Sequence, residues 1–177
     1  MSVCDRTHFG IIRFVHETLY GVFVNPQEWL GEAGMENGQR VLEVGSGPGF
    51  FTIPAAEIVG EGGRVYALDN NPFAVEHLRL KLKKKAVGNV EVLLEDAAKT
   101  GLPDGSLDLV FLFGVFHALQ DQVDAVLDEI HRVLKAGGVL SIRSGVAKEQ
   151  VTRAVVRTGK FRALETKGKT VNFQRVP

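Results

Sequence analysis

Short apolar runs alternate with longer segments of helical spacing from residue 40 onward. Runs rich in Val, Leu and Ile predict strands near residues 40–45, 64–69, 90–95, 107–113 and 138–143. Between them, apolar positions at helical spacing predict helices near residues 49–59, 72–86 and 120–134, the last closed by Gly137-Gly138. Continuously apolar strands are typical of sheets covered on both faces, so the pattern predicts an α/β domain with a largely parallel sheet.

The N-terminal part of the chain differs in kind. Apolar residues recur at helical spacing between residues 9 and 23, and Asn25-Pro26 then restarts a short helix that carries Trp29. We therefore expect residues 1–38 to form a helical cap in front of the sheet.

The C-terminal part predicts a further helix and a hairpin. Residues 147–158 have helical spacing, whereas 161–167 and 170–176 resemble two strands joined by a tight turn at Gly168. This pair should be an antiparallel addition to the parallel sheet. At this length one domain is expected over residues 1–177, with a Rossmann-like core at 39–177.

The first strand runs into a glycine-rich turn, Gly45-Ser46-Gly47-Pro48-Gly49, ahead of a predicted helix. Such glycines allow a sharp bend and let a ligand approach the peptide groups closely. A dinucleotide fingerprint would place a glycine at position 50, so that a pyrophosphate rests on the helix N-terminus. Position 50 is Phe, and Glu43 precedes the turn. The turn therefore disfavours a diphosphate ligand and a dinucleotide-dependent oxidoreductase.

Acidic residues end the second and third predicted strands. Asp69 lies about twenty residues beyond the glycine turn, where an acid can accept hydrogen bonds from ribose hydroxyls, and Asp96 is followed by Ala97. Taken singly, each aspartate could equally cap a helix. Because the carboxyl ends of parallel strands meet at one edge, the aspartates and the glycine turn together favour one binding crevice.

Four stretches of the sequence resemble the successive motifs of class I S-adenosylmethionine-dependent methyltransferases, in the same order and spacing, over about residues 38–143. They are VLEVGSGPGFFT, VYALDNNP, LEDAAKTGLPDGSLDLVFLFGVFHAL and RVLKAGGVLSI. The resemblance implies a three-layer sandwich around a seven-stranded sheet whose last strand is antiparallel, with S-adenosylmethionine as the cofactor. Small-molecule methyltransferases that act on metabolites such as quinone precursors look nearest.

The resemblance also implies the cofactor-binding residues. The glycine turn would pack against the methionine part and the ribose, with Glu43 near the amino-acid moiety and Asp69 on the ribose hydroxyls. Asp96 would bind the adenine amino group, and Asn70 would help to line the adenine pocket. The full expected set is Glu43, Gly45, Ser46, Gly47, Gly49, Asp69, Asn70, Asp96 and Ala97.

The methyl acceptor should lie beyond the fourth predicted strand. Methyl transfer from a sulfonium is an in-line displacement that needs alignment and, for some acceptors, removal of a proton. Phe113 and Gly114 end this strand, and His117 is the candidate general base, or else a residue that packs on Trp29 or Phe116. Arg143 ends the fifth strand and would either bind an acidic acceptor or pair with a nearby loop carboxylate.

Composition and charge narrow the remaining choices. The single Cys4 excludes a disulfide framework, and the five histidines show no metal-ligand spacing, so no metal is expected. No apolar stretch approaches the roughly 18 residues of a membrane span, which favours a cytoplasmic protein. The net charge of zero hides an asymmetry, because residues 148–177 carry +6 and the rest −6. This basic segment could bind an anionic partner or be a solvated edge hairpin.

We therefore expect methyl transfer to a small molecule, with nucleic acid an unlikely acceptor. The Asp/Asn-Pro-Pro-aromatic motif of amino-methylating nucleic-acid enzymes is missing after the fourth strand. The alternatives are an RNA methyltransferase that uses the basic segment and a non-catalytic module that binds S-adenosylmethionine. Because the chain has few insertions around the acceptor side, either the acceptor lies in an open cleft or a second protomer of a homodimer covers it.

Overall fold

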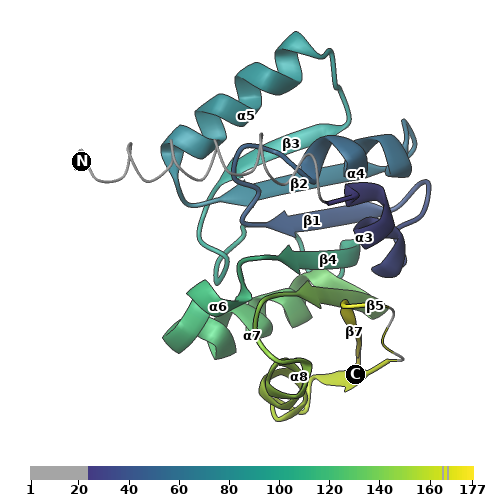
Figure 1. The fold of residues 1–177 in the computed structure, drawn as a ribbon, viewed down its shortest axis with the longest axis vertical. Helices are drawn as coiled ribbons and strands as arrows, with labels where there is room; N and C mark the ends of the chain where they lie inside the picture. Colours follow the sequence, from purple (N-terminus) through teal and green to yellow (C-terminus); the bar gives the residue numbers. More distant parts are fainter. Residues whose placement is uncertain (1–23, 165, 167) are drawn as a thin grey trace.

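The computed structural model describes residues 24–164, 166 and 168–177, and its strands form one seven-stranded sheet in the order β3-β2-β1-β4-β5-β7-β6 (Figure 1). The first five strands are parallel, whereas β7 is antiparallel to both β5 and β6. The strands are β1 (Arg40–Val44), β2 (Arg64–Asp69), β3 (Val90–Leu94), β4 (Leu107–Phe113), β5 (Leu134–Arg143), β6 (Phe161–Ala163) and β7 (Val171–Arg175). The predicted Rossmann-like sheet with an antiparallel C-terminal hairpin is confirmed.

Helices cover both faces of the sheet and give three layers (Figure 1). One face packs against α3 (Pro26–Glu32), α4 (Thr52–Val59) and α5 (Pro72–Lys84). The other packs against α6 (Phe116–Leu119), α7 (Val123–Val133) and α8 (Lys148–Val156), with the short 3-10 helix η2 (Gln120–Gln122) between α6 and α7. Both α3 and α5 begin with Asn-Pro, and Asn25 and Asn71 each cap their helix by accepting a backbone N–H.

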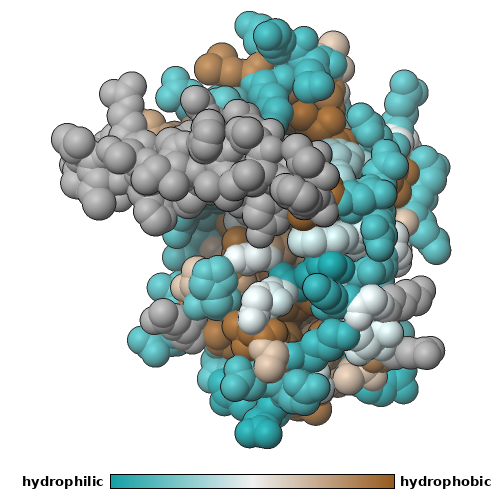
Figure 2. All heavy atoms as spheres, in the orientation of Figure 1, coloured by the Kyte–Doolittle hydropathy of each residue, from teal (hydrophilic) through white to brown (hydrophobic). Residues whose placement is uncertain are grey.

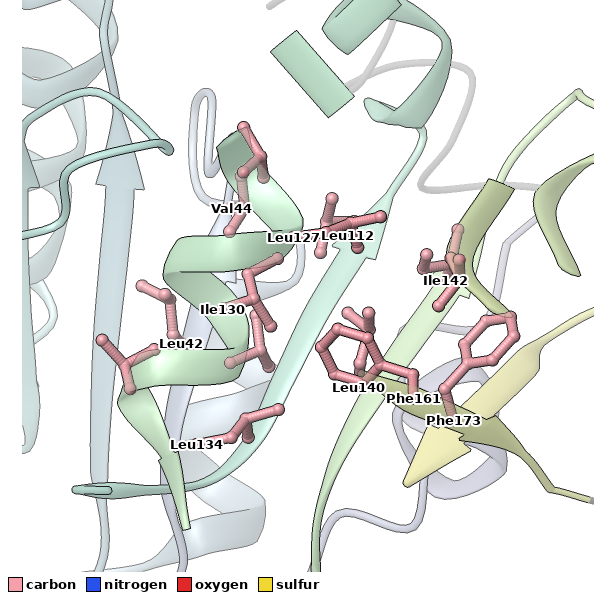
Figure 3. Close-up of a cluster of buried hydrophobic side chains, with 14 of the residues drawn as sticks. Leu42, Val44, Leu112, Leu127, Ile130, Leu134, Leu140, Ile142, Phe161 and Phe173 are labelled. Carbon is pink, nitrogen blue, oxygen red and sulfur yellow. The ribbon is translucent and has the colours of Figure 1, made fainter. Parts of the chain in front are cut away.

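The core follows from the alternation of side chains along the buried strands. Leu42 of β1, Leu112 of β4 and Leu140 of β5 point to the face where Leu127 and Ile130 of α7 pack (Figure 3). Their sequence neighbours point to the opposite face, against α3 and α4. Burial of both faces explains the almost uninterrupted apolar sequence of the central strands.

The boundary between the predicted third helix and fifth strand is wrong. The helix α7 ends at Val133, and β5 begins directly at Leu134, which already has an extended backbone with ψ of 141°. Gly137-Gly138 therefore lie inside a strand and do not close a helix. The β4–β5 register shifts between Leu107 and Leu109, so this part of β5 is an irregularity in the ladder that the glycines accommodate.

Other boundaries differ by a few residues. The predicted helix over 49–59 begins at Thr52, because Gly49 has φ of +79° and cannot continue a right-handed helix. The strand predicted over 161–167 ends at Ala163. The short helix after Asn25-Pro26 is confirmed as α3, whereas residues 1–23 of the predicted cap, including Cys4, lie outside the described residues.

Hydrophilic residues dominate the described surface in the view of Figure 2, with apolar residues in patches between them. In the described part of the chain, no helix combines the length and the apolar character that crossing a membrane requires.

Candidate functional site

The glycine turn lies at the carboxyl edge of the sheet and is fastened to the end of β2. The backbone amides of Gly45 and Ser46 donate to the carbonyl oxygen of Leu68 at 2.8 and 2.9 Å. The amide of Gly47 donates to Asp69 Oδ2 at 2.8 Å. The structure therefore brings together the predicted residues of the first and second strand ends.

The three glycines of the turn have positive φ angles and meet different surroundings. A Cβ at Gly45 would lie 2.5 Å from Val115 Cγ1, and a Cβ at Gly49 would lie 2.4 Å from Leu78 Cδ1. At Gly47, with φ of +51°, a Cβ would meet no atom of the described residues within 4 Å. Among the described residues, the turn is therefore packed at its ends and open at its middle, where a ligand can approach the backbone.

Two polar side chains of this edge keep unused hydrogen-bonding capacity. Asp69 Oδ1 accepts from the Asn71 amide at 2.8 Å, so each carboxylate oxygen has one backbone donor and a further lone pair. Ser46 Oγ is buried and has no hydrogen-bond partner among the described residues. Asn70, between β2 and the α5 cap, is exposed. Asp69 and Ser46 can thus bind a polar ligand without breaking existing bonds.

Glu43 is buried in β1, with 3% of its surface exposed, just before the turn. The hydroxyl of Thr52 donates to Glu43 Oε2 at 2.5 Å. Burial raises the pKa of Glu43 to about 8, and the charge of Asp69 adds to the rise, while the Thr52 hydrogen bond and the charge of Lys81 oppose it. At neutral pH this carboxyl holds its proton, and a cationic ligand group nearby would favour its ionisation.

Asp96 and Ala97 follow β3 on a turn that α7 holds in place. Asp96 is exposed and accepts from the Ala98 amide at 2.7 Å. Farther along this turn, the amide and the hydroxyl of Thr100 donate to Glu129 Oε1 at 2.8 and 2.7 Å. Hydrogen bonds from Arg132 hold the pKa of Glu129 low, at about 2, so Glu129 accepts the bonds from Thr100 as an ionised carboxylate. Glu129 belongs to none of the sequence motifs, although an acid on the apolar side of an amphipathic helix is a signal in the sequence.

The candidate acceptor residues gather where β4 and β5 end. Phe113 is buried against Phe51 and Trp29, with ring centroids 5.2 and 6.0 Å apart. Gly114 is exposed, has φ of +80° and leaves open space where a Cβ would stand. Its amide donates to the Arg143 carbonyl oxygen at 2.8 Å, so both strand ends meet here. His117 is exposed on α6, three residues after Gly114.

The side chain of Arg143 already has protein partners. Its Nη1 lies 2.5 Å from Glu32 Oε2 and donates to Thr170 Oγ1 at 3.2 Å, and its guanidinium carbon lies 3.7 Å from the centre of the Trp29 ring. We expected Arg143 either to bind an acidic acceptor or to pair with a carboxylate of a nearby loop. The structure shows an ion pair, and its carboxylate belongs to Glu32 at the end of α3. The indole of Trp29 is thus in contact with Arg143, Phe51 and Phe113.

The described residues contain no set of metal ligands, since no three His, Cys, Asp or Glu side chains among them converge on a point where an ion could bind. The chemistry that the edge offers is binding of a polar ligand over the glycine turn and of a second molecule near Gly114.

Comparison with known proteins identifies the family in which this arrangement occurs. A family model described as a methyltransferase domain matches residues 35–173. Demethylmenaquinone methyltransferase of Geobacillus kaustophilus (strain HTA426) is 34% identical over 105 residues, which cover 59% of this chain and 44% of that protein. The ubiquinone/menaquinone biosynthesis C-methyltransferase UbiE of Shewanella sp. (strain ANA-3) is 29% identical over 169 residues, covering 94% and 63%. The chain spans about half the length of the curated relatives it matches.

A solved structure, described as a SAM dependent methyltransferase from Aquifex aeolicus, has a TM-score of 0.80 to this chain at 27% identity and covers 94% of this chain and 97% of that one. The family model spans most of the chain, and the seven-stranded sheet with its antiparallel last strand is the one that the resemblance implies. The chain therefore belongs to the methyltransferase-domain family, as a class I, S-adenosylmethionine-dependent member.

Proposed function

We propose that this protein transfers a methyl group from S-adenosylmethionine to a small-molecule acceptor. The observation that carries the proposal is the glycine turn: no described residue fills the space beside Gly47, and the Gly47 amide is bonded to Asp69. The open backbone at Gly114, where β4 ends, supplies a second approach on the same edge of the sheet.

The residues of this edge fit the cofactor. Asp69 has spare lone pairs for the ribose hydroxyls, and Ser46 Oγ, which has no partner among the described residues, offers a further hydrogen bond. Glu43 supplies a carboxyl for the ammonium of the amino-acid part, and Asp96 with Ala97 would lie at the adenine. When bound, the sulfonium supplies an activated methyl group, so the protein need only align the acceptor, exclude water and accept a proton where the acceptor carries one.

The described residues at the ends of β4 and β5 are suited to excluding water and accepting a proton from the acceptor. Trp29, Phe51 and Phe113 form an apolar aromatic cluster beside Gly114 and would keep water from the reacting groups. His117 is the candidate base because it is a histidine on the helix that follows Gly114, and an imidazole nitrogen can accept a proton from an acceptor. Its exposure leaves it accessible to an acceptor.

A small molecule is favoured over RNA as the acceptor. Two basic residues of the C-terminal segment are paired with acids of α7, since Arg157 lies 2.6 Å from Asp124 and Lys160 lies 2.5 Å from Asp128. These pairs lower the charge available to a phosphate backbone. Relatives of this chain carry the names demethylmenaquinone methyltransferase and aklanonic acid methyltransferase DauC, which supports an acceptor of metabolite size.

Transfer of labelled methyl groups tests the proposal. Purified protein is incubated with methyl-labelled S-adenosylmethionine and either a metabolite extract or a pool of RNA, and incorporation is measured. We expect label in small molecules and none above background in RNA. Label in RNA alone would instead support an RNA methyltransferase. Binding of S-adenosylhomocysteine without any transfer would support a non-catalytic binding module.

His117→Ala tests the base once an acceptor is found. For a hydroxyl or phenol acceptor, we expect turnover to fall by about 10²–10⁴-fold, while the affinity for S-adenosylhomocysteine is unchanged. Asp121→Ala, an exposed change nearby on η2, serves as the control. An unchanged rate would leave His117 without a role in proton transfer.

A further inference from the structure

The helix α5 contacts the glycine turn through two side chains that are three residues apart. Leu78 occupies the space that a Cβ at Gly49 would need, with its Cδ1 2.4 Å from that position. Lys81, which is half-buried, donates from Nζ to the carbonyl oxygen of Pro48 at 3.0 Å. Residues at i and i+3 lie on one side of a helix, so a single face of α5 both packs against the turn and bonds to it.

The same lysine acts on Glu43. In the described part of the chain, the charged groups that influence Glu43 are Asp69 of β2, which disfavours its ionised form, and Lys81 of α5, which favours it. From α4 the neighbour is the neutral hydroxyl of Thr52, and in β4 it is the apolar Phe111, which is in register with Glu43. Among the described residues, Lys81 is therefore the cation that favours the ionised form of this carboxyl, while burial and Asp69 still hold its pKa high.

We infer that Lys81 is a positioning residue of the cofactor site, which holds the glycine turn in place through its hydrogen bond to the Pro48 carbonyl oxygen. The inference rests on the cofactor assignment made above. From sequence alone, Lys81 belonged to a run of helix-end cations, and no motif residue marks it.

Two consequences distinguish this role from ordinary helix stability. Ionisation of Glu43 matters only for a ligand with an ammonium group, so loss of Lys81 should affect S-adenosylhomocysteine more than methylthioadenosine, which lacks the amino-acid end. Binding of S-adenosylhomocysteine should strengthen as the pH rises, because Glu43 then gives up its proton more readily. Without Lys81 this rise should occur at higher pH, since the free carboxyl holds its proton longer.

Calorimetric titration of Lys81→Met across pH 6–9 tests both consequences. At pH 7 we expect at least about tenfold weaker binding of S-adenosylhomocysteine, a smaller loss for methylthioadenosine, and a pH dependence displaced to higher pH. Lys83→Met removes an exposed cation from the same helix and should behave as wild type. In a Glu43→Gln background, Lys81→Met should no longer displace the pH dependence, while the weakening through the turn remains.

The outcomes separate this inference from the proposed function. If Lys81→Met matches Lys83→Met with both ligands at every pH, the positioning role is wrong, while binding by the wild type still supports the cofactor assignment. If the wild type does not bind S-adenosylhomocysteine, the proposed function and this inference fail together. Should Lys81→Met lower the melting temperature, Lys81→Arg keeps the charge and must keep the wild-type pH dependence; a displaced profile there would overturn the role.

Discussion

At the scale of single residues, Glu43 shows how a binding group can lower the stability of its own fold. Its pKa is about 8 in the folded protein against about 4.5 in an unfolded chain. At a pH between these two values, unfolding therefore releases this proton. The protonated carboxyl makes its full contribution to the free energy of unfolding below about pH 4.5, and that contribution is lost as the pH rises through about 8.

Glu43→Gln should remove this dependence. The amide is neutral at every pH, and its oxygen can still accept from Thr52. A tenfold difference in proton affinity between the folded and unfolded chain corresponds to about 1.4 kcal/mol, so we expect the variant to gain a few kcal/mol over wild type at pH 8.5, with little difference at pH 4.5. Denaturant unfolding at both values measures this, and binding of S-adenosylhomocysteine should weaken in parallel. An equal difference at the two pH values would contradict it.

Asp69→Ala should weaken cofactor binding and leave the sheet intact. The carboxylate fixes the Gly47 and Asn71 amides, and its spare lone pairs are the candidate partners of the ribose. Losing charge-assisted bonds of about 1.5–3 kcal/mol each should reduce the affinity for S-adenosylhomocysteine at least about tenfold. Asp69→Asn keeps one acceptor and should fall between wild type and Asp69→Ala. Unchanged calorimetric binding would exclude a role for Asp69 in the ribose site.

Residues within the motifs could be predicted from the sequence because the order and spacing of the motifs mark them. Asp69 is bonded to Gly47, 22 residues away, and the two lie at the ends of adjacent parallel strands, which the spacing of the two motifs indicates. Lys81 and Glu129 could not be found in the same way, since their roles depend on which helix packs beside which turn. Their partners, Pro48 and Thr100, are 33 and 29 residues away in the chain.

At the scale of elements, the glycine turn is the part whose backbone conformation matters most. Gly47 combines a positive φ with open space among the described residues, so a larger residue there is strained and also projects toward the proposed ligand.

The predicted ends of helices and strands are least accurate where the chain passes from one conformation to another without a connecting loop. Leu134 passes directly from α7 into β5, and the glycines that resemble a helix end serve the strand instead.

Gly47→Val should abolish binding of S-adenosylhomocysteine while the protein still folds, with a modest loss of stability of about 1–2 kcal/mol from the strained φ. Gly62→Val is a matched control, because Gly62 also has open space around a Cβ and has no positive φ. We expect the control to bind as wild type in the same titration. Normal binding by Gly47→Val would mean that the turn only connects β1 to α4.

At the scale of the whole molecule, α3 is fastened to the C-terminal hairpin across most of the chain. Thr170 Oγ1 donates to Glu32 Oε2 at 2.6 Å, and Asn172 Nδ2 donates to the Glu32 carbonyl oxygen at 2.8 Å. These partners are 138 and 140 residues apart, and Arg143 joins them from β5. The apolar pattern predicts the sheet, but contacts between such distant polar residues leave no periodic signal in the sequence.

Glu32→Ala tests whether this fastening stabilises the fold. Only 13% and 16% of the Arg143 and Glu32 side chains are exposed, so removing the carboxylate leaves a largely buried guanidinium without its counter-charge. A loss of about 3 kcal/mol in the free energy of unfolding is expected. Lys160→Ala breaks the exposed pair with Asp128 and should cost at most about 1 kcal/mol. Because Glu32 is not bonded to the glycine turn, binding of S-adenosylhomocysteine by the folded variant should match wild type; equal costs for the two variants would mean that the Glu32–Arg143 pair adds no more than a surface contact.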